Sequence, residues 1–105
     1  MDNQSEIIMG LIANGGNARS LAMKAMYAAK AGNFEEAQEL LKASNESILQ
    51  AHNMQTQLLT KEANGERSEV SLLMVHAQDH LMNAMTVKDL ATEIVDIYKN
   101  QRGEA

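Results

Sequence analysis

At 105 residues the chain has the size of one small domain, so we expect residues 1–105 to fold as a single unit. It contains no proline and no cysteine and is rich in strong helix formers, which predicts an all-α fold without disulfides. A net charge of −5 argues against a nucleic-acid partner, and no apolar run approaches the roughly 18 residues that would span a bilayer. These features predict a soluble cytoplasmic protein without membrane insertion.

The first predicted helix begins near Ser5, a suitable N-cap, and ends at Gly32. Apolar residues recur along it at helical spacing, but the segment 14–17 (Asn-Gly-Gly-Asn) interrupts the pattern. Two adjacent glycines cost about 2 kcal/mol relative to alanine in a helix, so their presence needs a reason. Either another helix closely approaches Gly15 and Gly16, or the helix kinks there and frees backbone N–H groups near a ligand.

Two further helices are predicted downstream. Asn33 and Glu36 have the spacing of a capping box, which predicts the start of a second helix that stops before the Asn-Gly pair at 64–65. The third helix is expected from about 69 to 101. Short connections make neighbouring helices antiparallel, so the chain is predicted to form an antiparallel three-helix bundle.

The third predicted helix is apolar around nearly its whole circumference. One heptad seam runs through Leu73, Ala77, His80, Ala84, Val87, Ala91, Ile94 and Tyr98, and a second through Leu72, Val75, Asp79, Met82 and Thr86. A helix of this kind is buried on every side, which two partner helices of the same chain cannot achieve. We therefore expect other subunits to enclose it.

Asp79 is the one carboxylate in the second seam. An isolated charge in an apolar seam is unfavourable unless it is paired, protonated or bound to a cation. If a symmetry axis follows the seam, copies of Asp79 would meet, and a hard cation such as Mg²⁺ would relieve their repulsion. Alternatively, Asp79 hydrogen-bonds His76 or His80 within its own helix.

His76 and His80 are four residues apart and share one helix face. They can be two packed, hydrogen-bonded histidines. They can also bind a metal such as Zn²⁺ together with Asp79, in a helical metal-binding protein or a metallohydrolase, although the inverted zinc-protease motif has Glu where Asp79 stands. In the third interpretation a neutral imidazole carries a phosphoryl group, since its ring nitrogen is a good nucleophile near pH 7.

The segment 72–82, Leu-Leu-Met-Val-His-Ala-Gln-Asp-His-Leu-Met, resembles the active-site helix of the lactose/cellobiose family of enzyme IIA proteins. These proteins belong to the bacterial phosphoenolpyruvate-dependent sugar phosphotransferase system. The resemblance extends over nearly the whole chain and includes the segments 9–12, 16–20, 32–34, 51–52 and 55–56.

The resemblance implies a three-helix bundle that assembles as a homotrimer and carries phosphoryl groups without a nucleotide. His76 would accept the phosphoryl group on Nε2 from the carrier HPr and pass it to a cysteine of enzyme IIB, for the uptake of a β-linked disaccharide. Asp79 matches an aspartate on the three-fold axis, where three copies can hold a divalent ion such as Mg²⁺. Gln78 and His80 match neighbours that would stabilise the phosphoryl oxygens. Ala77 after His76 is closer to cellobiose- or chitobiose-type members than to lactose-type ones.

Overall fold

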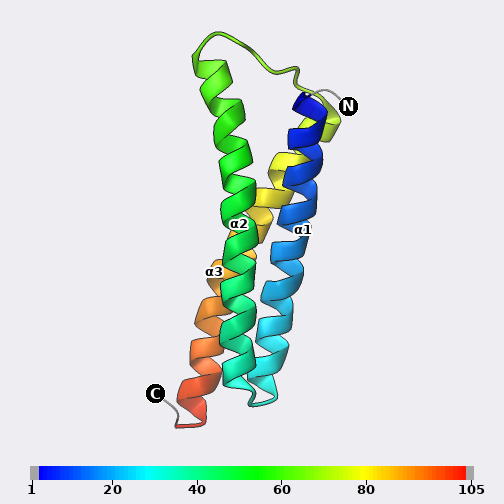
Figure 1. Cartoon of the computed structure of the whole chain (residues 1–105). Helices are drawn as coiled ribbons and strands as arrows, with labels where there is room; N and C mark the ends of the chain where they lie inside the picture. Colours follow the sequence, from blue (N-terminus) through cyan, green and yellow to red (C-terminus); the bar gives the residue numbers. More distant parts are fainter. Residues whose placement is uncertain (1–2, 104–105) are drawn as a thin grey trace.

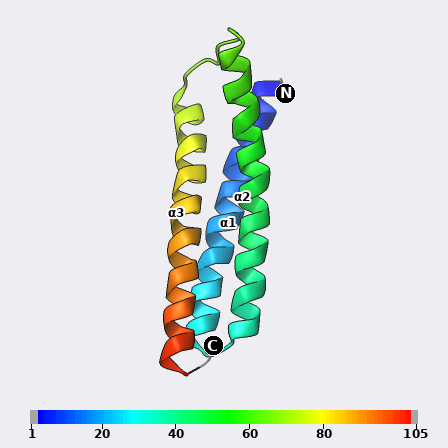
Figure 2. The same cartoon turned by 90° about the vertical axis from the view of Figure 1, so that its left-hand side faces the viewer.

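The computed structural model describes residues 3–103; residues 1, 2, 104 and 105 of the predicted domain lie outside this range. The described chain forms three helices, α1 (Asn3–Lys30), α2 (Phe34–Ala63) and α3 (Leu72–Gln101), and no strand. Helix α2 runs antiparallel to α1, and α3 returns parallel to α1 (Figures 1 and 2). The predicted all-α class and three-helix bundle are therefore confirmed, in a rod of 54 × 22 × 19 Å.

The ends of α1 and α2 follow the predicted glycine signals. Gly32 adopts φ +90°, and the N–H of Asn33 turns back to the carbonyl of Ala28 at 2.8 Å. Gly65 adopts φ +87°, and α2 ends at Ala63, directly before the predicted Asn-Gly pair. Only glycine enters this left-handed region without strain, which is why it closes both helices.

The predicted start of α2 is confirmed, because Asn33 is its N-cap residue and the helix begins at Phe34, but the predicted capping box is not formed. The side chain of Asn33 makes no cap hydrogen bond, because the Asn33 backbone, at φ −92° and ψ 73°, is occupied in closing α1 rather than extended as an N-cap. The cap that sequence analysis missed is Ser71, whose hydroxyl accepts a hydrogen bond from the N–H of Met74 at 3.1 Å. Helix α3 therefore begins at Leu72 instead of near residue 69.

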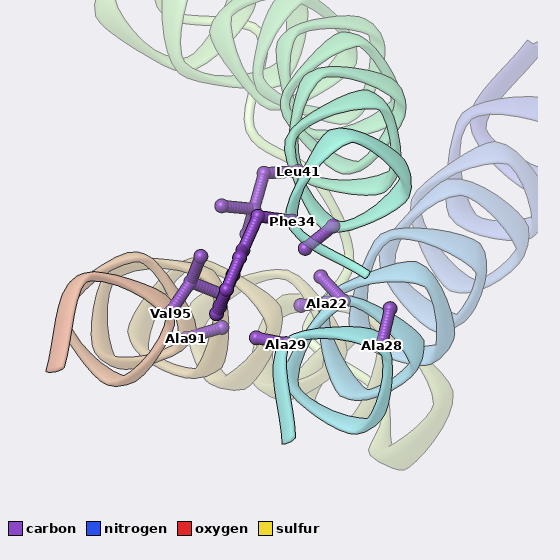
Figure 3. Close-up of a cluster of buried hydrophobic side chains, with 9 residues drawn as sticks. Ala22, Ala28, Ala29, Phe34, Leu41, Ala91 and Val95 are labelled. Carbon is purple, nitrogen blue, oxygen red and sulfur yellow. The ribbon is translucent and has the colours of Figure 1, made fainter. Parts of the chain in front are cut away.

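Small side chains fill much of the core. At the end of the bundle near the α1–α2 turn, Phe34 and Leu41 from α2 and Val95 from α3 pack against a layer of alanines (Figure 3). The buried alanines of this cluster are Ala22, Ala25, Ala28, Ala29, Ala37 and Ala91. Alanine lets helix backbones approach closely, so the positions of the helices are sensitive to single added methyl groups.

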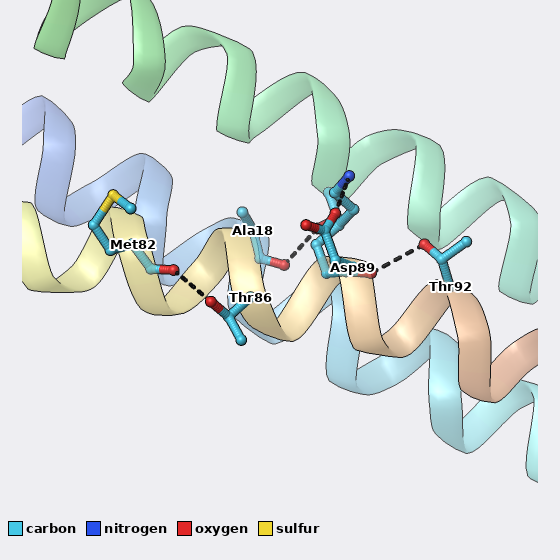
Figure 4. A network of polar contacts seen from close by, with 7 residues as sticks. Ala18, Met82, Thr86, Asp89 and Thr92 are labelled. Atoms are coloured by element: carbon cyan, nitrogen blue, oxygen red, sulfur yellow. Dashed lines mark hydrogen bonds and ion pairs between the residues drawn. The ribbon is translucent and has the colours of Figure 1, made fainter.

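Helix α1 is continuous through its two central glycines. A Cβ on Gly15 would lie 3.2 Å from the carbonyl carbon and oxygen of His80, whereas Gly16 faces open space. The close-approach interpretation is thus confirmed for Gly15, and α1 is not broken there. On its other side α1 is tied to α2, where the hydroxyl of Ser44 donates to the carbonyl of Ala18 at 2.7 Å; the Ala18 end of this bond is labelled in Figure 4.

One face of α3 is not covered by the chain itself. We call it the outward stripe, and its exposed residues are Leu72, Val75, Asp79, Met82, Thr86, Leu90, Glu93 and Ile97. Leu72 is 86% exposed. The hydroxyl of Thr86 donates to the carbonyl of Met82 at 3.2 Å (Figure 4), which satisfies it within the helix. The stripe is therefore largely apolar, with two carboxylates, Asp79 near the middle and Glu93 toward the C-terminal end of α3.

Candidate functional site

His76 and His80 lie one turn apart on α3 and are in direct contact. Their Nε2 atoms are 3.1 Å apart, and the two rings meet edge to face with centroids separated by 4.5 Å. One Nε2 must donate and the other accept, so the pair couples the tautomers of the two rings. His76 is exposed and His80 is half-buried, which leaves the first ring accessible to a partner.

The surroundings of His76 are apolar and open. Leu72 and Leu73 border it and form, with His76, a shallow hollow of about 530 Å³. Val70, at the end of the connection that precedes α3, is also exposed. An imidazole in such a surface can meet a macromolecule, because no cleft encloses it.

Asp79 does not hydrogen-bond either histidine. It lies exposed on the outward stripe, and within the described chain it forms no hydrogen bond or ion pair with His76 or His80. Among residues 3–103, no group of three or more His, Cys, Asp or Glu side chains is arranged to hold a metal ion. The alternative interpretation, a zinc site formed by His76, Asp79 and His80 of one chain, is therefore not supported by the described structure.

Gln78 lies on the side of α3 that faces α2. Its Oε1 accepts a hydrogen bond from Nε2 of Gln55 at 2.7 Å, and its Nε2 lies 4.0 Å from Sδ of Met74. Two residues along a helix correspond to a rotation of about 200°, so Gln78 and His76 point in nearly opposite directions. The expected place of Gln78 beside His76 is thus not found within one chain.

A second hollow, of about 440 Å³, lies between α1 and α3. We call it the α1–α3 hollow, and its lining residues are Arg19, Asp79, His80, Asn83 and Val87. Arg19 and Asn83 had not been predicted as site residues. Arg19 follows Gly15 by one turn, so the two residues share a face of α1. This spacing places Arg19 beside α3 only once the contact of Gly15 with α3 is known from the structure.

The fold and the site define a small helical protein that presents a coupled imidazole pair on an open surface. Residues 6–99 match the sequence model of the family described as "PTS system, Lactose/Cellobiose specific IIA subunit". The chain belongs to this family, which confirms the resemblance seen in the segment 72–82, and it is a phosphotransferase component of a sugar phosphotransferase system.

Several relatives are similar over most of their length. The lichenan-specific phosphotransferase enzyme IIA component of Bacillus subtilis is 52% identical over 105 residues, which cover 97% of this chain and 96% of the relative. The cellobiose-specific EIIA component of Lactococcus lactis subsp. lactis is 52% identical over 94 residues, covering 90% of this chain and 81% of the relative.

Solved structures agree with the fold. The crystal structure of the cellobiose-specific enzyme IIA from Bacillus anthracis superposes with a TM-score of 0.95 at 48% identity, covering 100% of this chain and 96% of that one. The IIA(chitobiose) chain in the solution structures of its complex with HPr from Escherichia coli superposes with a TM-score of 0.83 at 38% identity, covering 97% and 99%. No helix in the described part of the chain is long and apolar enough to cross a membrane.

Proposed function

We propose that this protein is a cytoplasmic phosphocarrier in which His76 accepts a phosphoryl group from HPr and passes it to a cysteine of the cognate enzyme IIB. The observation that carries the proposal is the exposed His76 ring, whose Nε2 contacts Nε2 of a neighbouring histidine within an open apolar rim. A related IIA chain has been solved in complex with HPr, which supports HPr as the donor.

The histidine pair supplies the nucleophile. When His80 donates its Nε2–H to Nε2 of His76, the proton of the neutral His76 ring is on Nδ1 and the Nε2 lone pair accepts this bond. The lone pair becomes available for attack when the bond between the two rings opens. Nε2 attacks phosphorus in line, the N–P bond of the donor breaks, and its electron pair returns to the donor ring. The His80 N–H is then free to donate to a phosphoryl oxygen, a charge-assisted bond that stabilises the product.

The second transfer reverses the role of His76. A cysteine thiolate of enzyme IIB attacks the phosphorus, an S–P bond forms, and the N–P bond breaks with its electron pair returning to Nε2 of His76. Both partners must reach the same atom in turn, so neither can be bound in an enclosing cleft. The exposed rim formed by Leu72 and Leu73 suits two successive partners of this kind.

The outward stripe supports assembly as a homotrimer with α3 near the three-fold axis. Its apolar members Leu72, Val75, Met82, Leu90 and Ile97 are all more than half exposed in the single chain. Contiguous apolar residues at helical spacing mark a protein–protein contact, and a chain this small gains a substantial part of its core by association. Parallel copies of α3 would bury the stripe and bring the Asp79 side chains together.

Asp79 is the proposed metal ligand. One chain lacks enough donors, because no cluster of three ligand-type residues occurs among those the structure describes. Three symmetry-related carboxylates would supply oxygen donors of the kind that Mg²⁺ prefers, so the residues fit the ion only in the assembled protein. The bound ion would offset the repulsion among the three carboxylates.

His80 is the phosphoryl-stabilising residue that the geometry of one chain supports. Gln78 is held against α2 by Gln55, so it would reach a phosphoryl group only from a neighbouring copy in the trimer. For the sugar, we propose a β-linked disaccharide of the cellobiose or chitobiose type. The relatives named for lichenan, cellobiose and N,N'-diacetylchitobiose support this assignment, as does Ala77 after His76.

The experiment is intact mass spectrometry after incubation with phosphoenolpyruvate, enzyme I and HPr. We expect one acid-labile phosphoryl group per chain, absent in His76→Ala and retained in His52→Ala. His52 is the matched control, because it is an exposed histidine on α2. No mass gain in the presence of phosphorylated HPr would contradict the carrier role. Activity that survives His76→Ala would support a structural adaptor, and stoichiometric Zn²⁺ in the purified protein would support the metallohydrolase.

A further inference from the structure

Arg19 is a cation that lies beside the site, and the phosphoryl transfer described above assigns it no role. It lines the α1–α3 hollow together with Asp79 and His80. On α3, His76, His80 and Asn83 recur at steps of four and three residues, so they follow one line along the helix surface. The α1–α3 hollow therefore lies directly next to the histidine pair, on the side toward the C-terminal end of α3.

The packing of α1 explains why Arg19 is on this side. Gly15, one turn earlier, lies against the backbone of His80, because a Cβ added at Gly15 would lie 3.2 Å from the His80 carbonyl carbon and oxygen. Residues one turn apart share a helix face, so Arg19 is also on the side toward α3. The carbonyl of Ala18 is meanwhile bonded to Ser44 of α2, which holds the orientation of α1 at this level.

Phosphorylation would create a charge imbalance at this place. A phosphoryl group adds a charge of about −1.5 to −2 near neutral pH, and on His76 it would lie three residues from the carboxylate of Asp79. The guanidinium of Arg19 keeps its charge at any physiological pH and offers several N–H donors. Among residues 3–103 the only ion pair joins Lys88 and Asp89, so Arg19 is not committed to another acid.

We propose that Arg19 is a positioning residue of the phosphoryl site, whose guanidinium balances the negative charge that Asp79 and a phosphoryl group on His76 bring to one side of α3. This inference rests on the proposed phosphocarrier function. The free protein already contains the Asp79 charge, and phosphorylation adds to it. Arg19 therefore stabilises the phosphorylated form more than the free form and shifts the phosphoryl equilibrium with HPr toward this protein.

The test is the equilibrium constant for phosphoryl exchange with HPr, measured by intact mass in mixtures of the two proteins at one ionic strength. Arg19→Met removes the charge but keeps an apolar stem, and Arg19→Lys keeps the charge. Lys24→Gln is the matched control, because it removes a charge of the same sign from an exposed position on the same helix. We expect Arg19→Met to lower the constant about tenfold, as for the loss of one charged hydrogen-bonding partner. Arg19→Lys should recover most of the loss and Lys24→Gln should match wild type.

Equal equilibrium constants for Arg19→Met and Lys24→Gln would overturn the proposal. A purely structural role would lower the unfolding midpoint or the assembled mass of Arg19→Met while leaving the equilibrium constant unchanged, and this outcome would also overturn it. If wild type itself takes no phosphoryl group from phosphorylated HPr, the proposed function fails instead, so the two failures are distinguishable.

The wild-type protein offers a second measurement that does not depend on the folding of a variant. The chain has three arginines, and the Nε–Hε resonances of ¹⁵N-labelled protein can be followed as His76 becomes phosphorylated. We expect the Arg19 signal to shift and those of Arg67 and Arg102 to stay in place. Arg102 is a suitable internal reference, because it lies at the far end of the bundle and donates to the carbonyl of Lys30 at 3.5 Å. An unshifted Arg19 signal in fully phosphorylated protein would rule out the proposed charge balance.

Discussion

Replacing Gly15 with alanine tests the contact that places α1 against the site. The new Cβ would lie 3.2 Å from the carbonyl carbon and oxygen of His80 and 3.3 Å from the backbone nitrogen of Leu81. These are helix backbone atoms, which cannot rotate away like the end of a flexible side chain, so α1 and α3 must separate by a few tenths of an ångström. Gly16→Ala is the matched control, because no neighbouring part of the structure lies within 4 Å of its Cβ position.

The difference in unfolding free energy between Gly15→Ala and Gly16→Ala measures the cost of the steric conflict at Gly15 alone. Both gain about 1 kcal/mol from replacing glycine by alanine within a helix. Only Gly15→Ala adds a steric conflict, which typically costs about 1–3 kcal/mol. We therefore expect Gly16→Ala to be more stable than wild type by about 1 kcal/mol, and Gly15→Ala to fall about 1–3 kcal/mol below Gly16→Ala. In a domain of this size, 1 kcal/mol corresponds to roughly 4–8 °C in melting temperature.

Thermal unfolding followed by circular dichroism measures this difference. All variants must be compared at one subunit concentration, because self-association makes the melting temperature depend on concentration. Since the strained contact is at the backbone of His80, we also expect Gly15→Ala to slow phosphoryl acceptance by His76 relative to Gly16→Ala. Equal melting temperatures for the two variants would refute the close approach of α1 and α3 at Gly15.

Three further predictions concern assembly and helix capping. Leu90→Asp should dissociate the proposed trimer, because it places a further charge in the outward stripe. Leu49→Asp on α2 should not, although the two leucines are similarly exposed at 57% and 52%. Equal masses of the two variants in sedimentation equilibrium would contradict the proposed interface. Asp79→Leu should keep or strengthen the proposed trimer, since apolar side chains would replace like charges at the proposed axis. Monomers in the same measurement would exclude Asp79 from the axis. Ser71→Ala should lower the free energy of unfolding, measured in urea, by about 1 kcal/mol, and Asn33→Ala should lower it by much less. The reason is that, of these two side chains, only that of Ser71 makes a cap hydrogen bond. Similar losses for both variants would show that the cap bond is unimportant.

The helices were predictable because local signals specify them. Composition predicts helix almost everywhere, and the glycines at 32 and 65 need no distant contact to end α1 and α2. The error at Asn33 arose where two local signals compete for one residue. Its backbone serves the end of α1, so its side chain does not cap α2, and residue spacing alone does not show which signal prevails.

The part of the site that lies on one face of α3 was predictable from the sequence. The contact between His76 and His80 follows from their spacing of four residues. The same rule places Gln78 on the opposite side of α3 from His76, where its bond to Gln55 is found, so its predicted role requires a neighbouring copy of the chain. Arg19 is different, because it joins the site through a contact between α1 and α3 that no local pattern reveals.

Helix α3 carries three surfaces side by side: buried residues of the core, the histidine pair and the outward stripe. Ala77, Ala84 and Ala91 are fully buried, while His76 and Asp79 lie on exposed faces. Asp79 precedes His80 by one residue, so the outward stripe is rotated by about 100° from the face of His80. Copies that pack along the stripe must therefore stand directly beside the histidines. Assembly would enclose the α1–α3 hollow from one side and lower the effective dielectric around any phosphoryl group on His76, which strengthens each charge interaction made there. For this reason the effects of Arg19 and His80 substitutions on phosphoryl exchange should be larger in the trimer than in a monomeric variant such as Leu90→Asp.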